Sequence, residues 1–225
     1  MAATTTYILD TSCLQDPSVY ARCLQNLSSA RQRKASSFYF EKDRLLSAAA
    51  GVVLDFGLKH YGLSEKEVCM AYNPFEKPFL PRRTGLHFNL SHSGTKAICS
   101  FSDCEVGADI EEISGRHTAL TKSICTEEET GYLSLLEKEE YTAAFFRIWT
   151  AKEAFLKCIG KGLSVSLREL NTTPFGTPLK ILQNCCPGDF FFRNYDCPGY
   201  QISVCARHDS FADDLIAADL SGILH

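Results

Sequence analysis

One acidic pair inside an apolar stretch places the strongest constraint on how this chain folds. Asp109 and Glu111 lie two residues apart and are flanked by alanine and isoleucine. Side chains two apart in a strand point to the same face, so a strand over residues 106–111 brings both carboxyls together. Carboxyl groups that close are hard to keep ionised without a cation between them. The sequence therefore predicts a divalent metal ion with oxygen ligands beside this strand.

The composition is that of an ordinary globular protein. Its 225 residues are 45% hydrophobic and 22% charged, which is enough chain for one large domain or two small ones. The formal net charge of −4 gives no case for nucleic acid or anionic membranes as partners, so a local basic cluster must hold any anionic ligand. No apolar run reaches the ~18 residues of a membrane helix.

Cysteine usage points to a reducing compartment. The chain has eleven cysteines, an odd number, with no CxxC pair and no zinc-site spacing. The N-terminus also lacks the pattern of a secretory signal. Together these features predict a cytoplasmic protein whose thiols are reduced.

The alternation of helical and strand patterns predicts an α+β fold. Helices are expected after Asp16, from Asp43 to Gly62 and over residues 139–159, each with apolar residues at three-to-four spacing or a cap signal. Short strands are expected at 6–10, 67–72, 86–90, 97–101, 106–111, 163–165, 179–182, 190–195 and 200–206, with a turn over 91–95. Helix-rich and strand-rich parts follow one another twice, which predicts two similar subdomains, residues 1–103 and 104–225.

A polar cluster interrupts the apolar course of the helix expected over residues 139–159. Glu153 and Lys157 stand four apart, in the order that forms an ordinary salt bridge on a helix surface. Taken with Asp109 and Glu111, Glu153 instead completes a set of three carboxyls. Such a set suits Mg²⁺, which keeps several waters and binds substrate phosphates.

Basic residues elsewhere supply the cations that a pyrophosphate needs. The candidates are Lys77, His92, Lys152 and Lys157. A metal ion and cations around a phosphoanhydride indicate phosphoryl-type transfer. The glycine motifs of Walker and Rossmann nucleotide sites are absent. A hydrolase triad is disfavoured, because adjacent residues such as Ser91 and His92 rarely face each other as a triad requires.

Several short motifs, in this order, resemble the surfactin-synthetase-activating type of 4′-phosphopantetheinyl transferase. They are residues 88–93 (FNLSHS), 107–111 (GADIE), 149–157 (WTAKEAFLK) and 160–163 (GKGL). Weaker agreement extends to Asp43-Arg44 and Lys77-Pro78. Each motif alone is weak, but three in register over most of the chain are specific.

The resemblance implies transfer of phosphopantetheine from coenzyme A to a serine hydroxyl of an apo carrier protein, with release of adenosine 3′,5′-bisphosphate. By motif, the ligands of Mg²⁺, or of Mn²⁺ as an alternative, are Asp109, Glu111 and Glu153. Glu153, or a water that it holds, is also the base for the serine. The implied phosphate contacts are His92, Lys152 and Lys157. The other residues implied to hold coenzyme A are Ser91, Lys77, Arg31, Lys34 and Arg44.

The resemblance also implies an architecture and a set of partners. Two similar α+β subdomains related by a pseudo-two-fold axis would enclose the active site in the cleft between them. An acyl, peptidyl or aryl carrier protein would dock beside that cleft. Because the fold contains its own pseudo-dimer, a monomer is expected. Neither nucleic acid nor a membrane is expected as a partner.

The chain departs from the family pattern at two positions. Glu76 stands where a glycine often precedes the Lys-Pro pair, and Leu46 stands where many members carry a basic residue. Both bear on coenzyme A affinity more than on the chemistry. Two alternatives stay open, a catalytically silent member that binds coenzyme A or carrier proteins, and an unrelated Mg²⁺-dependent nucleotide hydrolase. The complete set of carboxyls argues against the first, and the Trp-x-x-Lys-Glu-x-x-x-Lys spacing argues against the second.

Overall fold

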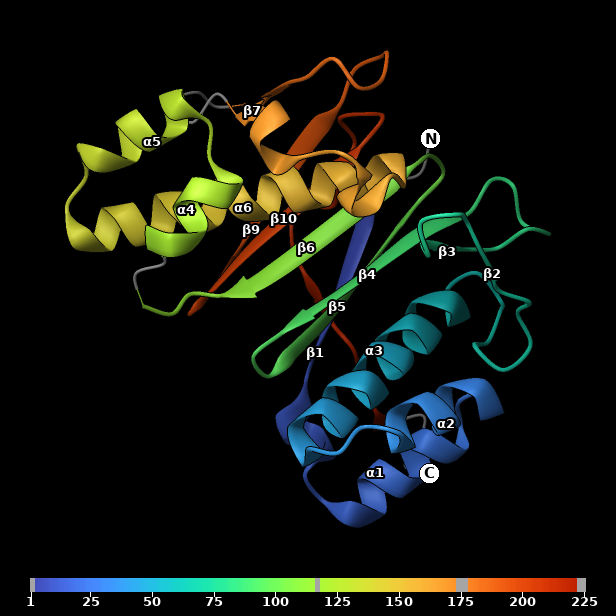
Figure 1. Ribbon diagram of the computed structural model, residues 1–225. Coiled ribbons are helices and arrows are strands. Elements are labelled where there is room, and N and C mark those ends of the chain that lie inside the picture. The colour runs from blue at the N-terminus through green and yellow to red at the C-terminus, as the bar shows by residue number, and fades with distance from the viewer. Residues whose placement is uncertain (1–2, 116–117, 173–177, 222–225) are drawn as a thin grey trace.

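Two β-sheets stand side by side in the computed structural model, which describes residues 3–115, 118–172 and 178–221 (Figure 1). One sheet has the strand order β11-β1-β5-β4 and the other has the order β6-β10-β9. The pairs in both sheets are antiparallel, apart from the parallel pair of β1 and β11. Helices pack against each sheet, so the predicted α+β class is confirmed.

The N-terminal half places one long helix on its sheet. Its elements are β1 (Thr5–Asp10), α1 (Pro17–Gln25), α2 (Ser29–Ser36), α3 (Glu41–Lys59), β2 (Ala71–Tyr72), β3 (Pro78–Phe79), β4 (His87–Ser93) and β5 (Lys96–Ser102). A run of small residues lets α3 approach the sheet closely. At Gly57, an added Cβ would lie 2.1 Å from the ring of Phe101 on β5. The short helices α1 and α2 pack on α3 in turn (Figure 1).

The C-terminal half repeats this plan with a longer helix. Its elements are β6 (Val106–Glu112), α4 (Thr118–Ile124), α5 (Glu127–Ser134), α6 (Lys138–Ile159), β7 (Asn171–Thr172), β8 (Ile181–Leu182), β9 (Phe191–Cys197), β10 (Tyr200–Ala206) and β11 (Ile216–Ala217). Helix α6 crosses β6 and β10, and α4 and α5 gather at its N-terminal end (Figure 1). Among the described helices, none has the length and apolar character to cross a membrane.

Polar side chains on β4 join the two sheets. Asn89, Ser91 and Ser93 accept hydrogen bonds from backbone N–H groups of β6 at 2.9, 3.4 and 3.1 Å. The two serine hydroxyls also donate to the carboxyls of Asp109 and Glu111, each at 2.9 Å. These side chains thus replace the backbone carbonyls that would accept hydrogen bonds in a continuous sheet. They provide acceptors for the backbone N–H groups at the edge of β6.

Most of the elements expected from the sequence are confirmed, including the strand at β6 and the helix α6. The turn expected over residues 91–95 is wrong in extent. Residues 91–93 complete β4, and the chain turns at Gly94, whose φ of +57° suits glycine. The strand expected over 67–72 is limited to β2, and the one expected over 163–165 is replaced by a 3₁₀ turn at Gly162–Ser164.

The end of the chain returns to the first sheet. The expected division after residue 103 does fall between β5 and β6, which belong to different sheets. Beyond β10, however, β11 pairs with β1, with Tyr7 opposite Ile216, and Thr4 bridges to Phe211. The division of the chain after residue 103 therefore stays a prediction. It does not describe the segment beyond β10, which pairs with the first sheet.

The close contact of β6 with α6 makes Gly107 sensitive to substitution. An added Cβ there would lie 2.0 Å from the backbone oxygen of Ala154. We expect Gly107→Ala to push α6 off the strand and to lower the free energy of unfolding by about 3 kcal/mol. Gly131→Ala is the matched control, because nothing lies within 4 Å of its Cβ on exposed α5. The control should gain about 0.5–1 kcal/mol in urea unfolding, and equal effects of the two changes would contradict the packing account.

Candidate active site

A cavity of about 540 Å³ opens where the two halves meet. Its walls come from α2, α3, β4, β6 and α6, with β2 and β3 at the rim. The sequence-predicted residues that line it are Arg31, Lys34, Ser91, His92, Asp109, Glu111, Glu153 and Lys157. The structure thus brings together acidic and basic side chains from both halves of the chain.

Three carboxyls face this cavity from β6 and α6. Asp109 and Glu111 share one face of the strand, as their spacing predicts, and Glu153 lies on the helix that crosses it. One oxygen of Asp109 accepts hydrogen bonds from Ser91 at 2.9 Å and from Lys157 at 2.5 Å. Its other oxygen, Oδ2, is buried and has no hydrogen-bond partner among the described residues. A buried acceptor without a donor is costly, so this atom is open to a ligand.

The crowding of these carboxyls changes their acidity. Burial, and then the charge of Asp109, raise the pKa of Glu111 from its ordinary 4.5 to about 7. Burial and the same neighbour also raise the pKa of Glu153. Both shifts have the direction expected when carboxyls are buried close together, and the single charge of Lys157 only partly offsets them. A bound cation would remove this penalty.

The donor set of the cavity fits a hard divalent cation. All three side chains offer oxygen, which Mg²⁺ prefers, and the unpartnered Oδ2 of Asp109 provides a ready acceptor. Another cluster, formed by Asp103, Cys104 and His208, is more compact. Among the described residues, it is the group whose possible ligand atoms all lie within 4.8 Å of one another. The carboxyls of Asp109, Glu111 and Glu153 thus line one cavity, but their oxygens do not all lie within 4.8 Å of one another.

Hydrogen bonding argues against a metal ion at that other cluster. His208 Nδ1 accepts the backbone N–H of Ser210 at 3.2 Å, so the proton of the neutral ring is on Nε2. That Nε2 donates to Asp103 at 3.0 Å and lies 3.2 Å from the hydroxyl of Ser102. Neither ring nitrogen keeps a free lone pair for a metal ion, and the cluster is satisfied as a hydrogen-bonded joint.

Cationic groups face the carboxyls across the cavity. Lys157 bridges Asp109 and Ser91, with its ammonium 3.0 Å from the serine oxygen. Partial desolvation, followed by the nearby charges of Lys157, Lys34 and Arg31, lowers the pKa of His92 below its usual range. Lys157, Lys34 and Arg31 line the same cavity as His92, and they are the groups there that could bind an anion.

The basic run at residues 31–34 forms part of the cavity wall, on α2. The side chain of Arg31 is 12% exposed, and its Nε lies 3.9 Å from a carboxyl oxygen of Glu65. Lys34, one turn further on, is exposed. The structure thus places Arg31 and Lys34 in the wall of the cavity that the three carboxyls also line.

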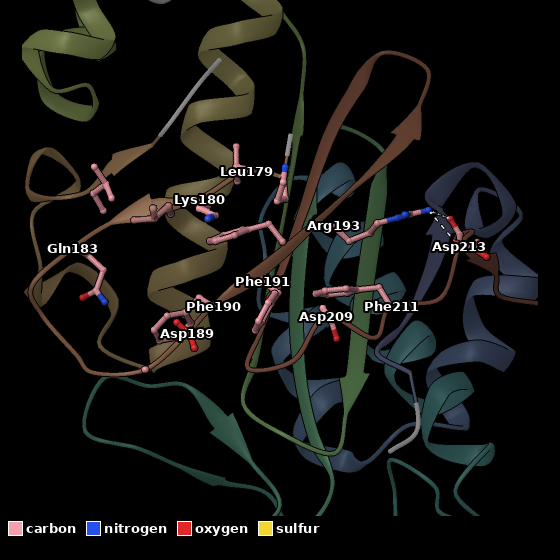
Figure 2. A pocket seen from close by; sticks show the side chains of 15 residues that line it. Leu179, Lys180, Gln183, Asp189, Phe190, Phe191, Arg193, Asp209, Phe211 and Asp213 are labelled. Atoms are coloured by element: carbon pink, nitrogen blue, oxygen red, sulfur yellow. Dashed lines mark hydrogen bonds and ion pairs between the residues drawn. The ribbon is translucent and has the colours of Figure 1, made fainter. Parts of the chain in front are cut away.

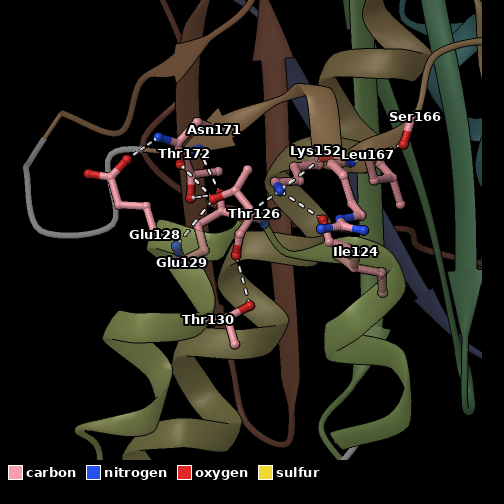
Figure 3. Close-up of polar contacts among 11 residues, drawn as sticks. Ile124, Thr126, Glu128, Glu129, Thr130, Lys152, Ser166, Leu167, Asn171 and Thr172 are labelled. Atoms are coloured by element: carbon pink, nitrogen blue, oxygen red, sulfur yellow. Dashed lines mark hydrogen bonds and ion pairs between the residues drawn. The ribbon is translucent and has the colours of Figure 1, made fainter.

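Lys152 lies outside the cavity, and its predicted phosphate contact is not supported by this geometry. The side chain is fully buried, and its ammonium donates to Glu129 at 2.5 Å and to the carbonyl oxygens of Ile124 and Leu167 at 2.9 and 3.0 Å (Figure 3). Glu129 in turn accepts from the backbone and hydroxyl of Thr172, both at 2.7 Å. All three ammonium protons are occupied, so Lys152 ties α4, α5 and β7 to α6.

Lys77 and Arg44 are also not among the residues that line the cavity. The ammonium of Lys77 donates to the carbonyl oxygens of Val106 and Cys158, at 2.9 and 3.1 Å, and burial lowers its pKa. Arg44 donates to the carbonyl oxygens of Phe38 and Tyr39 at 3.2 and 2.8 Å. Both residues fasten backbone segments that border the cavity, and a direct contact of either with coenzyme A is not supported.

The structure adds a polar residue that sequence reasoning missed. Ser47 lines the cavity from α3, is 5% exposed, and its hydroxyl has no partner among the described residues. The signal was a hydroxyl on the buried face of an otherwise apolar helix, which is costly unless something bonds to it. Leu46 beside it lines the cavity as well, so the departure from a basic residue falls inside the site.

Backbone strain marks the rim of the cavity at Glu76. Its φ of +63° lies in the left-handed region, where a glycine has no steric penalty. The residue lines the cavity and contributes a negative charge there. The family pattern places a glycine at this position, so the departure noted in the sequence has a conformational cost as well as an electrostatic one.

A larger cavity, of about 690 Å³, lies beside β8 and β9. Figure 2 shows Phe190, Phe191 and Phe211 around it, while Arg193 reaches toward Asp213. That guanidinium donates to the carbonyl oxygen of Asp213 at 2.9 Å, with the carboxyl at 3.4 Å. The aspartates of this larger cavity, Asp189, Asp209 and Asp213, are exposed, whereas the three carboxyls between the two halves are buried or half-buried, so chemistry is assigned to the smaller cavity.

The raised pKa of Glu111 predicts a specific dependence of stability on pH. Because the folded state holds this proton more tightly than the unfolded state, the contribution is full below pH about 4.5 and is lost as the pH rises through 7. In EDTA, Glu111→Gln should therefore match the wild type at low pH and unfold at a higher temperature near pH 8. Each kcal/mol gained corresponds to about 2–4 °C. A difference that stays constant from acid to alkaline pH would refute the assigned cause.

The chain is similar to known proteins over most of its length. Residues 105–205 match the family model described as "4′-phosphopantetheinyl transferase superfamily". The chain is 27% identical over 210 residues to the 4′-phosphopantetheinyl transferase Sfp of Bacillus subtilis, covering 90% of this chain and 92% of that protein. It is 31% identical over 156 residues to the transferase psf-1 of Bacillus pumilus, covering 68% and 66%. A crystal structure of a holo-(acyl-carrier-protein) synthase from Bacillus anthracis aligns at a TM-score of 0.42 and 18% identity, over 48% of this chain and 97% of that one.

Proposed function

Because the chain belongs to the 4′-phosphopantetheinyl transferase superfamily and is an enzyme of that type, we propose that it uses coenzyme A as its donor. The acceptor is a serine hydroxyl of an apo acyl, peptidyl or aryl carrier protein. The serine oxygen forms a bond to the β-phosphorus as the phosphoanhydride bond to the nucleotide breaks. Adenosine 3′,5′-bisphosphate leaves, and the serine proton passes to a base in the cavity.

The observation that carries this proposal is the meeting of three carboxyls and several cations in one cavity. Asp109, Glu111 and Glu153 would hold Mg²⁺ or Mn²⁺, and the unpartnered Oδ2 of Asp109 supports that role. When bound, such an ion neutralises negative charge on phosphate oxygens. Lys157 and His92 would contact the pyrophosphate, and Ser91 would orient Lys157 through their 3.0 Å contact.

Glu153 is the proposed base, acting directly or through a water. Its side chain lines the cavity beside Asp109 and Lys157, where it could accept the proton of an incoming serine. Arg31 and Lys34 would face the phosphates at the nucleotide end, since α2 forms the opposite wall. Within this arrangement, Lys152, Lys77 and Arg44 keep the structural roles that their hydrogen bonds support.

The central test is transfer onto carrier proteins. The protein would be incubated with coenzyme A, Mg²⁺ and apo carriers of fatty-acid, polyketide and peptide synthases, and each carrier would be weighed by mass spectrometry. A gain of one phosphopantetheine group on a serine supports the proposal. Absence of any gain across the panel, with coenzyme A still bound, would instead support a silent binding protein.

The role of Glu153 has a matched control on the same helix. We expect Glu153→Gln to lower transfer by about 100-fold or more, the usual contribution of a positioned acid–base group, without lowering the melting temperature. Glu139→Gln removes an exposed carboxyl from the first turn of α6 and should leave transfer unaltered. Wild-type turnover in Glu153→Gln would remove this residue from the mechanism.

A further inference from the structure

The helix that carries Arg31 and Lys34 has little apolar packing of its own. Of the eight residues of α2, one, Ala35, is buried. Isolated helices of this length are marginal in water, so tertiary contacts must hold α2 in place. Its orientation matters because Arg31 and Lys34 line the cavity from this helix.

A buried carboxyl from a distant loop caps the start of α2. Glu65 is 3% exposed and lies in the turn after α3. One of its oxygens accepts the backbone N–H of Ser28 at 2.5 Å, and the other accepts the Ser28 hydroxyl at 2.8 Å. Ser28 is itself the N-cap of α2, and its hydroxyl accepts the backbone N–H of Arg31 at 3.3 Å. A carboxyl at a helix N-terminus is favoured by the helix dipole as well.

Glu65 is in turn held by the core. Its backbone N–H donates to the carboxyl of Asp55 at 2.8 Å, and Asp55 is 2% exposed in the middle of α3. Asp55 is also paired with Lys59 at 2.9 Å, one turn along the same helix. A continuous set of hydrogen bonds therefore runs from α3 through Glu65 to the cap of α2.

The carboxyl of Glu65 also lies near the guanidinium of Arg31 but is too far away for a hydrogen bond. The separation of 3.9 Å is long for a charge-assisted hydrogen bond, and each oxygen of Glu65 already accepts a hydrogen bond from Ser28. The stem of Arg31 lies over Gly51 of α3, where an added Cβ would meet it at 2.9 Å. Glu65 and Gly51 thus restrict the Arg31 side chain from two sides, and its guanidinium remains able to bind a ligand in the cavity.

We propose that Glu65 is a positioning residue for the anionic co-substrate. It fixes the cap of α2 and the direction of Arg31, and through them it sets the affinity of the cavity for the phosphates of coenzyme A. The identity of that co-substrate rests on the proposed function. Because Glu65 acts on binding through Arg31 and stands apart from the three carboxyls, its removal should raise the KM for coenzyme A and spare kcat.

The test combines kinetics with direct binding in the full chain. Glu65→Gln keeps the shape of the side chain but gives it an amide that cannot accept both Ser28 bonds. We expect the KM for coenzyme A to rise about 10-fold with kcat within about twofold. In an Arg31→Ala background, the same change should add less than about twofold, since its route to the ligand is gone. Glu67→Gln, an exposed carboxyl on the same turn, is the control and should change neither constant.

A binding measurement separates this inference from the proposed reaction. Calorimetric titration with adenosine 3′,5′-bisphosphate should show the same weakening and the same non-additivity whether or not any carrier is modified. If Glu65→Gln does not fold, Ser28→Ala removes the hydroxyl bond to Glu65 and the cap of α2, keeps the backbone bond, and should weaken binding in the same direction. A loss of kcat at unchanged KM, or full additivity with Arg31→Ala, would overturn the positioning role.

Discussion

The site depends on the hydrogen bonds by which β4 is joined to β6. Ser91 accepts a backbone N–H of β6, donates to Asp109 and receives the ammonium of Lys157. In a continuous sheet, backbone carbonyls would satisfy that edge and the two strands would lie closer. Side-chain hydroxyls keep the strands joined but farther apart, and the cavity opens where they separate. The residues that hold the two halves together are therefore also those that orient the carboxyls.

Both halves of the molecule contribute charged side chains to this cavity. The three carboxyls proposed to hold the metal ion come from β6 and α6, whereas Arg31, Lys34 and His92 come from α2 and β4. Lys157 adds a cation from the C-terminal half, and Asp43 and Glu76 add carboxyls from the N-terminal half. The raised pKa of Glu111 shows the cost of gathering carboxyls without a bound cation. Stability is thus lowered at the place where a metal ion and a polyanionic substrate would restore it, a pattern common at functional sites.

Local periodicity was enough to predict the carboxyl half of the site. The two-residue spacing of Asp109 and Glu111 placed them on one face, and the apolar stripe of α6 identified the helix that carries Glu153. The same reasoning could not place Lys152. It is rotated about 100° from Glu153 around the helix, toward a carboxyl that lies 23 residues earlier in the chain. Its burial depends on how α5 docks, which no local pattern describes. The partners of Lys77 and Arg44 are backbone carbonyls, whose positions are likewise set by the tertiary fold.

The position of a bound metal ion tests the account most directly. Crystals grown with Mn²⁺ and coenzyme A would be measured for anomalous scattering of manganese. We expect one peak among the carboxyls of Asp109, Glu111 and Glu153, at the mouth shared by both halves. A peak at Asp103, Cys104 and His208, or none near the three carboxyls while coenzyme A is bound, would contradict the assignment of this cavity as the active site.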